Sequence, residues 1–222
     1  MILIPAGQFL MGSPAGVGKD DEQPRHLVWV DAFYIDSFPV TFAQYDQFCA
    51  AAGRDRVDDQ GWGRGDRPVI NVTWFEAQAY CQWAGKRLCT EAEWERACRA
   101  GSDQLYFFGS EVAPLDQYAW YRDNSGGRTQ PVAKKRPNPF GLFDMHGNVW
   151  EWCEDWYAED YYARSPECNP VGPLDGEFRV LRGGSWRSDA DGVRAGHRRD
   201  YGNPETRENV CGFRCALTLV EA

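Results

Sequence analysis

A polar segment near the end of the chain, residues 186–209, carries most of the side chains that could do chemistry or bind a ligand. It begins at a Gly183-Gly184-Ser185-Trp186 corner and is followed by Gly212-Phe213-Arg214. Glycines permit close backbone turns, and burial of Trp186 and Phe213 would fix both ends. The candidate ligand-binding residues are Trp186, Arg187, Ser188, Asp189, Asp191, His197, Arg199, Asp200, Tyr201, Asn203 and Glu205. Such a segment is either a catalytic loop or a ligand-binding surface.

Common catalytic motifs do not occur in the sequence. The three histidines are His26, His146 and His197, and no two of them are three or four residues apart. There is no nucleophile elbow, phosphate-binding loop or His-Glu-x-x-His motif. The eight cysteines could form disulfides, bind a metal or remain buried thiols. Because no Cys-x-x-Cys spacing is present, we expect mostly buried thiols with one or two bridges.

Composition limits the class of protein. The 222 residues suit one domain over residues 1–222, and 43% hydrophobic residues with ten tryptophans can form a substantial core. A formal charge of −9 argues against nucleic acid as partner. The apolar N-terminal run is too short to span a membrane, so we read it as an edge strand. No secretory leader is visible, so we expect a cytoplasmic location unless a missing segment directs the protein to a surface.

Three helices are predicted in the first half of the chain by capping boxes. The boxes are Thr41 with Gln44, Thr73 with Glu76, and Thr90 with Glu93. Apolar residues follow each box at helical spacing, and Gly53, Gly85 and Gly101 are plausible stops. After Gly101 short aromatic runs alternate with Gly, Pro, Asn and Asp, which predicts short strands and long loops. The fold class is therefore α+β.

Seven ordered motifs give the chain a resemblance to a known family. They are residues 4–13, 39–45, 68–74, 87–94, 141–152, 182–186 and 212–214. The chain resembles the sulfatase-modifying-factor family, that of the formylglycine-generating enzyme. The resemblance implies a C-type-lectin-like fold with a small antiparallel sheet, flanking helices, much irregular loop and bound calcium. It leaves the function open, because one fold can carry many functions.

The residues that the family uses for catalysis are missing. The enzyme holds copper(I) with two thiolates shortly after the Gly-Gly-Ser-aromatic corner, and soft copper(I) favours sulfur. The matching positions here are Ser188 and Gly192 or Val193, and no cysteine lies between Arg182 and Val210. The family's iron-dependent branch needs three converging histidines. We therefore expect neither copper nor iron, and a copper oxidase or other oxidoreductase of the family remains the alternative function.

The resemblance also implies a structural calcium site and one disulfide. The family's calcium ligands match Asp144, Gly147, Val149 and Glu151, types that suit calcium because its ligands are oxygen atoms. In the other interpretation, Asp144 and Glu151 cap turns or pair with arginine. The family's disulfide matches Cys81 and Cys215, and reduced, buried thiols are equally compatible with these positions.

A second resemblance concerns the polar segment. Variable proteins of diversity-generating retroelements place a mutable ligand-binding surface on this fold, just before a fixed Gly-Phe-Arg. This similarity implies a non-catalytic domain that binds a protein or other macromolecular ligand through residues 186–209. We expect Arg194, Arg198, Arg207 and Arg214 to form fixed salt bridges instead of contacting the ligand.

Overall fold

The computed structural model describes residues 1–199 and 202–219, in which each predicted capping box begins an α-helix. The helices are α1 (Phe42–Ala52), α2 (Trp74–Trp83) and α3 (Glu91–Arg99). In each helix the threonine hydroxyl accepts a hydrogen bond from the N3 amide, and the N3 side chain accepts one from the threonine amide. Gly53 is the left-handed C-cap of α1, and Gly85 and Gly101 directly follow the C-caps of α2 and α3. The three predicted helices are confirmed.

The described residues otherwise contain short strands and single 3₁₀ turns. The strands are β1 (Ile2–Ile4), β2 (Gly7–Met11), β3 (His26–Val30), β4 (Phe33–Ile35), β5 (Arg87–Leu88), β6 (Trp150–Trp156), β7 (Arg179–Arg182), β8 (Arg198–Arg199), β9 (Cys211–Gly212) and β10 (Cys215–Thr218). The 3₁₀ turns are η1 (Asp20–Glu22), η2 (Leu115–Gln117), η3 (Tyr161–Arg164) and η4 (Asp191–Val193). The α+β class, with long loops after α3, is confirmed.

The strands form three small sheets. One has the order β1-β4-β10-β5 and is antiparallel throughout, so the N-terminal strand β1 is an edge strand as predicted. β2 and β3 form a separate antiparallel pair. The third sheet has the order β8-β7-β6-β9, and its β6–β9 pair is parallel. The expected antiparallel sheet is therefore present, together with one parallel pair.

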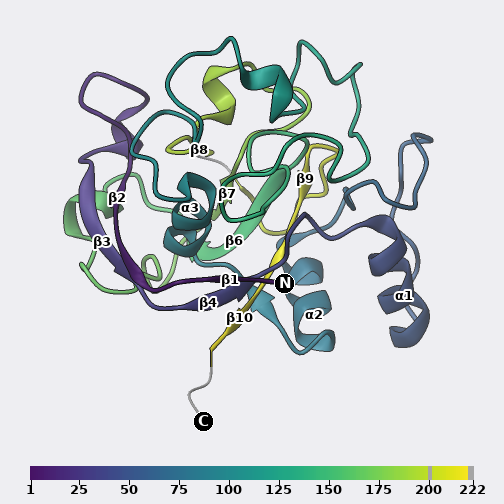
Figure 1. Cartoon of the computed structure of the whole chain (residues 1–222). Helices are drawn as coiled ribbons and strands as arrows, with labels where there is room; N and C mark the ends of the chain where they lie inside the picture. The colour runs from purple at the N-terminus through teal and green to yellow at the C-terminus, as the bar shows by residue number, and fades with distance from the viewer. Residues whose placement is uncertain (200–201, 220–222) are drawn as a thin grey trace.

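The C-terminal segment runs through the whole molecule (Figure 1). It passes from β7 into the loop that contains η4, returns through β8 and β9, and enters the first sheet as β10. Figure 1 places η4 among the loops at one end of the molecule and β10 at the other. The polar segment thus lies between two strands that the sheets hold in place.

The largest hydrophobic core cluster lies between α1, α2, β6 and the residues around Phe213. A second packs α3 against β1 to β4 and β6. Phe213 is 0% exposed and contacts the rings of Tyr80 and Tyr45, with centroids 5.4 and 6.3 Å apart. The Gly-Phe-Arg motif is therefore fixed by aromatic packing.

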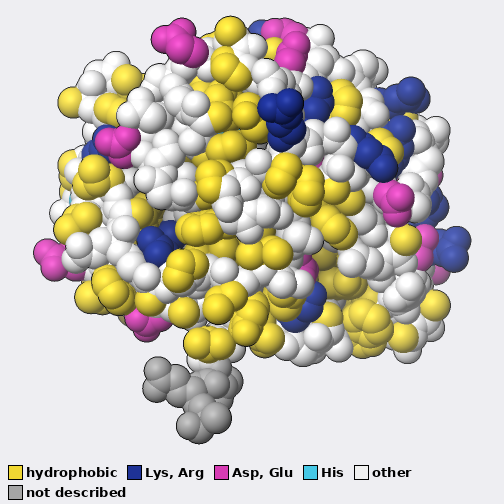
Figure 2. Space-filling model, in the orientation of Figure 1, with side chains coloured by type: hydrophobic (Ala, Val, Ile, Leu, Met, Phe, Trp, Pro, Cys, Tyr) yellow, Lys and Arg dark blue, Asp and Glu magenta, His cyan; other side chains and the backbone are white. Residues whose placement is uncertain are grey.

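The surface carries interspersed charges and scattered apolar side chains. Figure 2 shows acidic groups dispersed over one face instead of gathered in one cluster, as expected for a solvated surface. Leu3 and Leu217 point outward from their strands and are 48% and 39% exposed. No helix in the described part of the chain is long and apolar enough to cross a membrane.

Seven of the eight cysteines are buried, and all eight are free thiols in the structure; Cys168 is the exposed one. The expectation of mostly buried thiols is confirmed. The Sγ atoms of Cys81 in α2 and Cys215 in β10 lie 3.3 Å apart. The pairing that the resemblance implies is thus close in space, while its oxidation stays a prediction.

Candidate functional site

Two glycines and two aromatic rings shape the corner that begins the polar segment. Gly183 and Gly184 have φ of 95° and 75°, a region that favours glycine, and a Cβ on Gly184 would lie 2.5 Å from a side-chain atom of Val193. Trp186 is half-buried, packs edge-on against Trp62 at 5.3 Å, and donates a hydrogen bond from Nε1 to the Asn209 carbonyl. The corner therefore fixes the start of the segment and leaves the Trp186 side chain partly exposed.

Buried arginines anchor the segment to the core. Arg194 pairs with Glu22 (Nη1–Oε2, 2.8 Å) and Arg198 with Glu91 (Nε–Oε1, 2.7 Å), all four side chains being at most 2% exposed. The further pairs are Arg182 with Glu91 and Glu95, Arg207 with Glu76, and Arg214 with Glu151. The expectation that Arg194, Arg198, Arg207 and Arg214 form salt bridges is confirmed.

The predicted ligand-binding residues divide by exposure. Those that are exposed are Arg187, Asp189, Asp191, Asn203 and Glu205. Those that are half-buried are Trp186, Ser188 and His197. Arg199 is buried at 9% exposure, and its Nη2 lies 2.8 Å from Glu208 Oε2. Asp200 and Tyr201 lie outside the described residues.

A cavity of about 420 Å³ lies beneath the exposed side chains. It is lined by Lys19, Trp150, Ser185, Arg187, Ser188, His197, Arg199, Glu208 and Val210. Four of these were predicted as site residues, including Arg199, which reaches the cavity from its ion pair. The prediction missed Lys19 and Trp150, which are far from the segment in sequence, so no local pattern could have indicated them.

His197 is a neutral side chain in this cavity. Burial is the main reason that the pKa of His197 is lowered to about 4, and Arg194 adds to the lowering against the opposite effect of Glu22. Its ring lies against Trp150 with centroids 5.6 Å apart. At neutral pH the cavity therefore presents an uncharged imidazole beside an aromatic wall.

The two positions of the family's copper thiolates hold other groups. The Ser188 hydroxyl accepts a hydrogen bond from the Ser185 amide at 3.0 Å. Val193 is 0% exposed and packs with Tyr106 and other apolar residues. The nearby Cys211 is fully buried, and burial raises the pKa of its thiol to about 12, so it is not a thiolate at neutral pH. Ser188 and Val193 thus supply no thiolate at these two positions.

The predicted calcium residues occupy a tight, buried turn. Asp144 and Asn148 have φ of 57° and 63°, which aspartate and asparagine tolerate better than most residues. Asp144 Oδ2 accepts a hydrogen bond from the Ala133 amide at 2.9 Å. Among the described residues Asp144 has no ion-pair partner, and burial raises its pKa to about 6. A buried carboxylate in this state could bind a cation.

Glu151 pairs with an arginine, as expected if its role is an ion pair instead of a calcium ligand. Its oxygens lie 2.6 and 2.7 Å from Arg214 Nε and Nη2, and Oε2 also accepts a hydrogen bond from Trp94 Nε1 at 2.7 Å. The Gly147 carbonyl accepts from the Val149 amide at 2.9 Å. In the described residues no three His, Cys, Asp or Glu side chains converge on one point. Asp144 therefore fits the predicted role better than Glu151 does.

This loop-rich α+β domain has a C-type-lectin-like fold of the formylglycine-generating-enzyme type. Its last segment is framed by Gly-Gly-Ser-Trp and Gly-Phe-Arg. The chain belongs to the family of the sulfatase-modifying factor enzyme 1-like domain, whose model matches residues 1–219. The family predicted from the seven motifs is therefore confirmed.

Individual relatives differ in function. The chain is 34% identical to the formylglycine-generating enzyme of Streptomyces coelicolor, over 97% of this chain and 88% of that enzyme. The structure of Treponema denticola variable protein 1 is similar with a TM-score of 0.85 and 32% identity, covering 98% of this chain and 94% of that chain. The proteins that resemble this chain thus include one named as an enzyme and one named as a variable protein.

A third relative is a much longer protein. The chain is 38% identical to the serine/threonine-protein kinase pkn1 of Chlamydia caviae, over 97% of this chain and 37% of the kinase. The chain thus spans little more than a third of the length of that relative.

Proposed function

We propose that this domain is a non-catalytic ligand-binding module whose binding surface comprises the exposed side chains of residues 186–209 and the cavity beneath them. One observation carries the proposal: the segment alternates between arginines anchored in the core and side chains left exposed. Arg194 and Arg198 fix the backbone, while Arg187, Asn203 and Glu205 are free to contact a partner. Recognition and stability therefore reside in different residues.

The partner is best sought among macromolecules. The exposed residues offer charged and polar contacts, and the half-buried Trp186 and His197 offer aromatic surface, a combination that is typical of adaptable protein-binding surfaces. The likeness to Treponema denticola variable protein 1 supports this reading. The likeness to formylglycine-generating enzymes supports an oxidase less well, because Ser188 and either Gly192 or Val193 stand where the two thiolates are required.

We expect the triple variant Arg187→Ser, Asn203→Ser, Glu205→Ser to keep its melting temperature and to lose partner capture. Exposed side chains contribute only a few tenths of a kcal/mol to stability, whereas contact residues can contribute about 1–2 kcal/mol to binding. Thermal melting and affinity capture from extracts of the source organism, read by mass spectrometry, measure the two effects side by side.

The matched control replaces three exposed residues elsewhere on the surface, Glu111, Arg136 and Glu159, with serine. Partners retained by this control and lost by the triple variant identify the binding surface. Identical capture by both variants would place recognition outside residues 186–209. A fall in melting temperature of the triple variant alone would mean that its side chains are structural.

We further propose that calcium binds at Asp144 and stabilises the fold. A cation would compensate the buried carboxylate, and a ligand bound by the native state alone adds about 2.7 kcal/mol at a hundredfold excess over Kd. Calcium should therefore raise the melting temperature relative to chelator, and Asp144→Asn should abolish the difference, since asparagine suits the same left-handed backbone. Asp175→Asn, an exposed site, is the control. Equal melting of the unaltered protein in calcium and in chelator would contradict calcium binding.

A further inference from the structure

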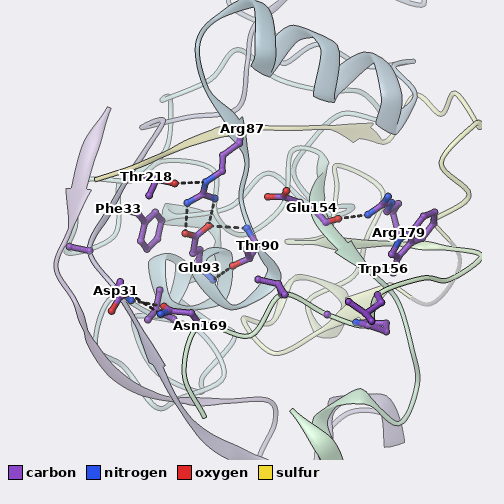
Figure 3. A pocket seen from close by; sticks show the side chains of 16 residues that line it. Asp31, Phe33, Arg87, Thr90, Glu93, Glu154, Trp156, Asn169, Arg179 and Thr218 are labelled. Atoms are coloured by element: carbon purple, nitrogen blue, oxygen red, sulfur yellow. Dashed lines mark hydrogen bonds and ion pairs between the residues drawn. The ribbon is translucent and has the colours of Figure 1, made fainter. Parts of the chain in front are cut away.

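A second cavity, of about 510 Å³, lies on elements that the C-terminal surface does not use. It is lined by Val30, Asp31, Ala32, Phe33, Arg87, Thr90, Glu93, Glu154, Trp156, Asn169, Val171, Gly172, Pro173, Leu174, Arg179 and Thr218. These residues come from the turn between β3 and β4, the start of α3, the end of β6, the loop after Cys168, and the strands β5, β7 and β10 (Figure 3). A volume of this size is in the range of small-molecule sites.

The walls of this cavity are largely apolar, and part of its rim has no packing partner. Phe33 is buried at its base, at 1% exposure. On the rim, Val171 is 61% exposed and Leu174 is 98% exposed. Folding gains almost no burial from Leu174, whereas a bound apolar group would cover it. The rim therefore favours a ligand with an apolar body.

Most charged groups of the cavity already have partners. Arg87 makes a two-point ion pair with Glu93, with both nitrogen–oxygen distances 2.6 Å, and donates a further hydrogen bond to Thr218. Asp31 accepts a hydrogen bond from Asn169 Nδ2 at 2.8 Å. Figure 3 shows these two groups on one side of the cavity. The Arg87–Glu93 pair is neutral overall, whereas the hydrogen-bond donors to Asp31 are uncharged, so the Asp31 carboxylate keeps its negative charge.

Arg179 is held by aromatic rings at the opposite side. Its guanidinium carbon lies 3.4 Å from the ring centroid of Trp156 and 3.7 Å from that of Trp74. One guanidinium nitrogen donates a hydrogen bond to the backbone carbonyl of Glu154. Stacking and this hydrogen bond fix the cation as part of the wall.

The side chain of Glu154 is different, because no hydrogen bond or ion pair to its carboxylate occurs among the described residues. Figure 3 shows it between the Arg87–Glu93 pair and Arg179. The pKa of the Glu154 carboxyl is raised, mainly by burial. The carboxylate is therefore partly dehydrated, although the residue as a whole is exposed. Three carboxylates and two guanidinium groups line the cavity, which leaves one negative charge in excess.

We propose that this cavity binds a small organic cation, in which an ammonium or guanidinium group pairs with Glu154 and an apolar body packs against Phe33, Val171 and Leu174. The chain's charge of −9 adds a long-range attraction for such a ligand. The site is separate from the C-terminal surface and does not depend on its function.

Three probes of equal length test the charge: hexylamine, hexanol and hexanoate, titrated into the whole chain and followed by calorimetry or NMR. Hexylamine should bind most tightly and hexanoate most weakly. Glu154→Gln should weaken hexylamine binding about tenfold, as expected for a charge-assisted hydrogen bond, and leave hexanol binding unchanged. Leu174→Ala should weaken both ligands.

Glu177→Gln, an exposed carboxylate outside the cavity, is the matched control and should change neither affinity. Equal affinity for hexylamine and hexanoate, or equal effects of the Glu154 and Glu177 variants, would overturn the proposal. Nα-acetyl-lysine amide represents a lysine residue within a peptide, so it tests whether the cavity prefers a peptide side chain to a small free amine. Tighter binding of this compound than of hexylamine would overturn the assignment to a small molecule.

Discussion

The variant Arg198→Met should lose about 3–5 kcal/mol of the free energy of unfolding. Arg198 is fully buried, contacts Glu91 at 2.7 and 3.0 Å, and lies between the rings of Tyr157 and Tyr162. Removing the guanidinium leaves the Glu91 carboxylate buried with less compensation, and this uncompensated charge is the main cost. Equilibrium denaturation in urea measures the change.

Arg164→Met is the matched control, because Arg164 makes an exposed pair with Asp160 at 3.0 Å, and solvent screening leaves such pairs little effect on stability. The double variant Arg198→Met, Glu91→Gln should recover part of the loss, since it also removes the unpaired charge. Losses of equal size at Arg198 and Arg164 would show that the buried pair does not anchor the segment.

Phe213→Ala should cost about 3–5 kcal/mol, and Trp186→Ala clearly less, although the sequence predicts a large loss at both. Phe213 is 0% exposed among aromatic rings, whereas Trp186 is half-buried. The cost of truncation follows the area buried and the cavity that is left. Denaturation of both variants, beside Trp83→Ala at 47% exposure, gives the order.

Equal losses of the free energy of unfolding at positions 213 and 186 would mean that the Trp186 ring is packed as tightly as the Phe213 ring. A smaller loss at position 213 than at position 83 would contradict the central packing of Phe213. If Trp186→Ala abolishes partner capture and lowers the free energy of unfolding only slightly, the Trp186 ring belongs to the binding surface.

Local sequence predicted local structure well. Each capping box begins a helix because its hydrogen bonds lie within four residues and need no distant partner. The pairing of Arg194 and Arg198 was also predictable in kind, since buried guanidinium groups require carboxylates. The partners themselves, Glu22 and Glu91, come from distant segments that only the fold brings together.

The candidate site was less predictable than the fold. Arg199 was predicted as a ligand contact, and the sequence did not indicate that it also pairs with Glu208 in the wall of the cavity. Lys19 lines the same cavity from a loop near the N-terminus, and nothing in its neighbourhood indicates this. No sequence periodicity or short-range motif predicts either contact, because each depends on how strands pair across the chain.

The arginine anchors also determine how the segment can diverge. Arg194 and Arg198 are four residues apart, and their carboxylate partners Glu22 and Glu91 are fixed in separate parts of the core. Exchanging one exposed side chain for another leaves this spacing intact. Inserting or deleting a residue between the anchors would force one arginine out of its ion pair. We therefore expect the segment to accept variation at constant length and to lose an ion pair when its length between the anchors changes.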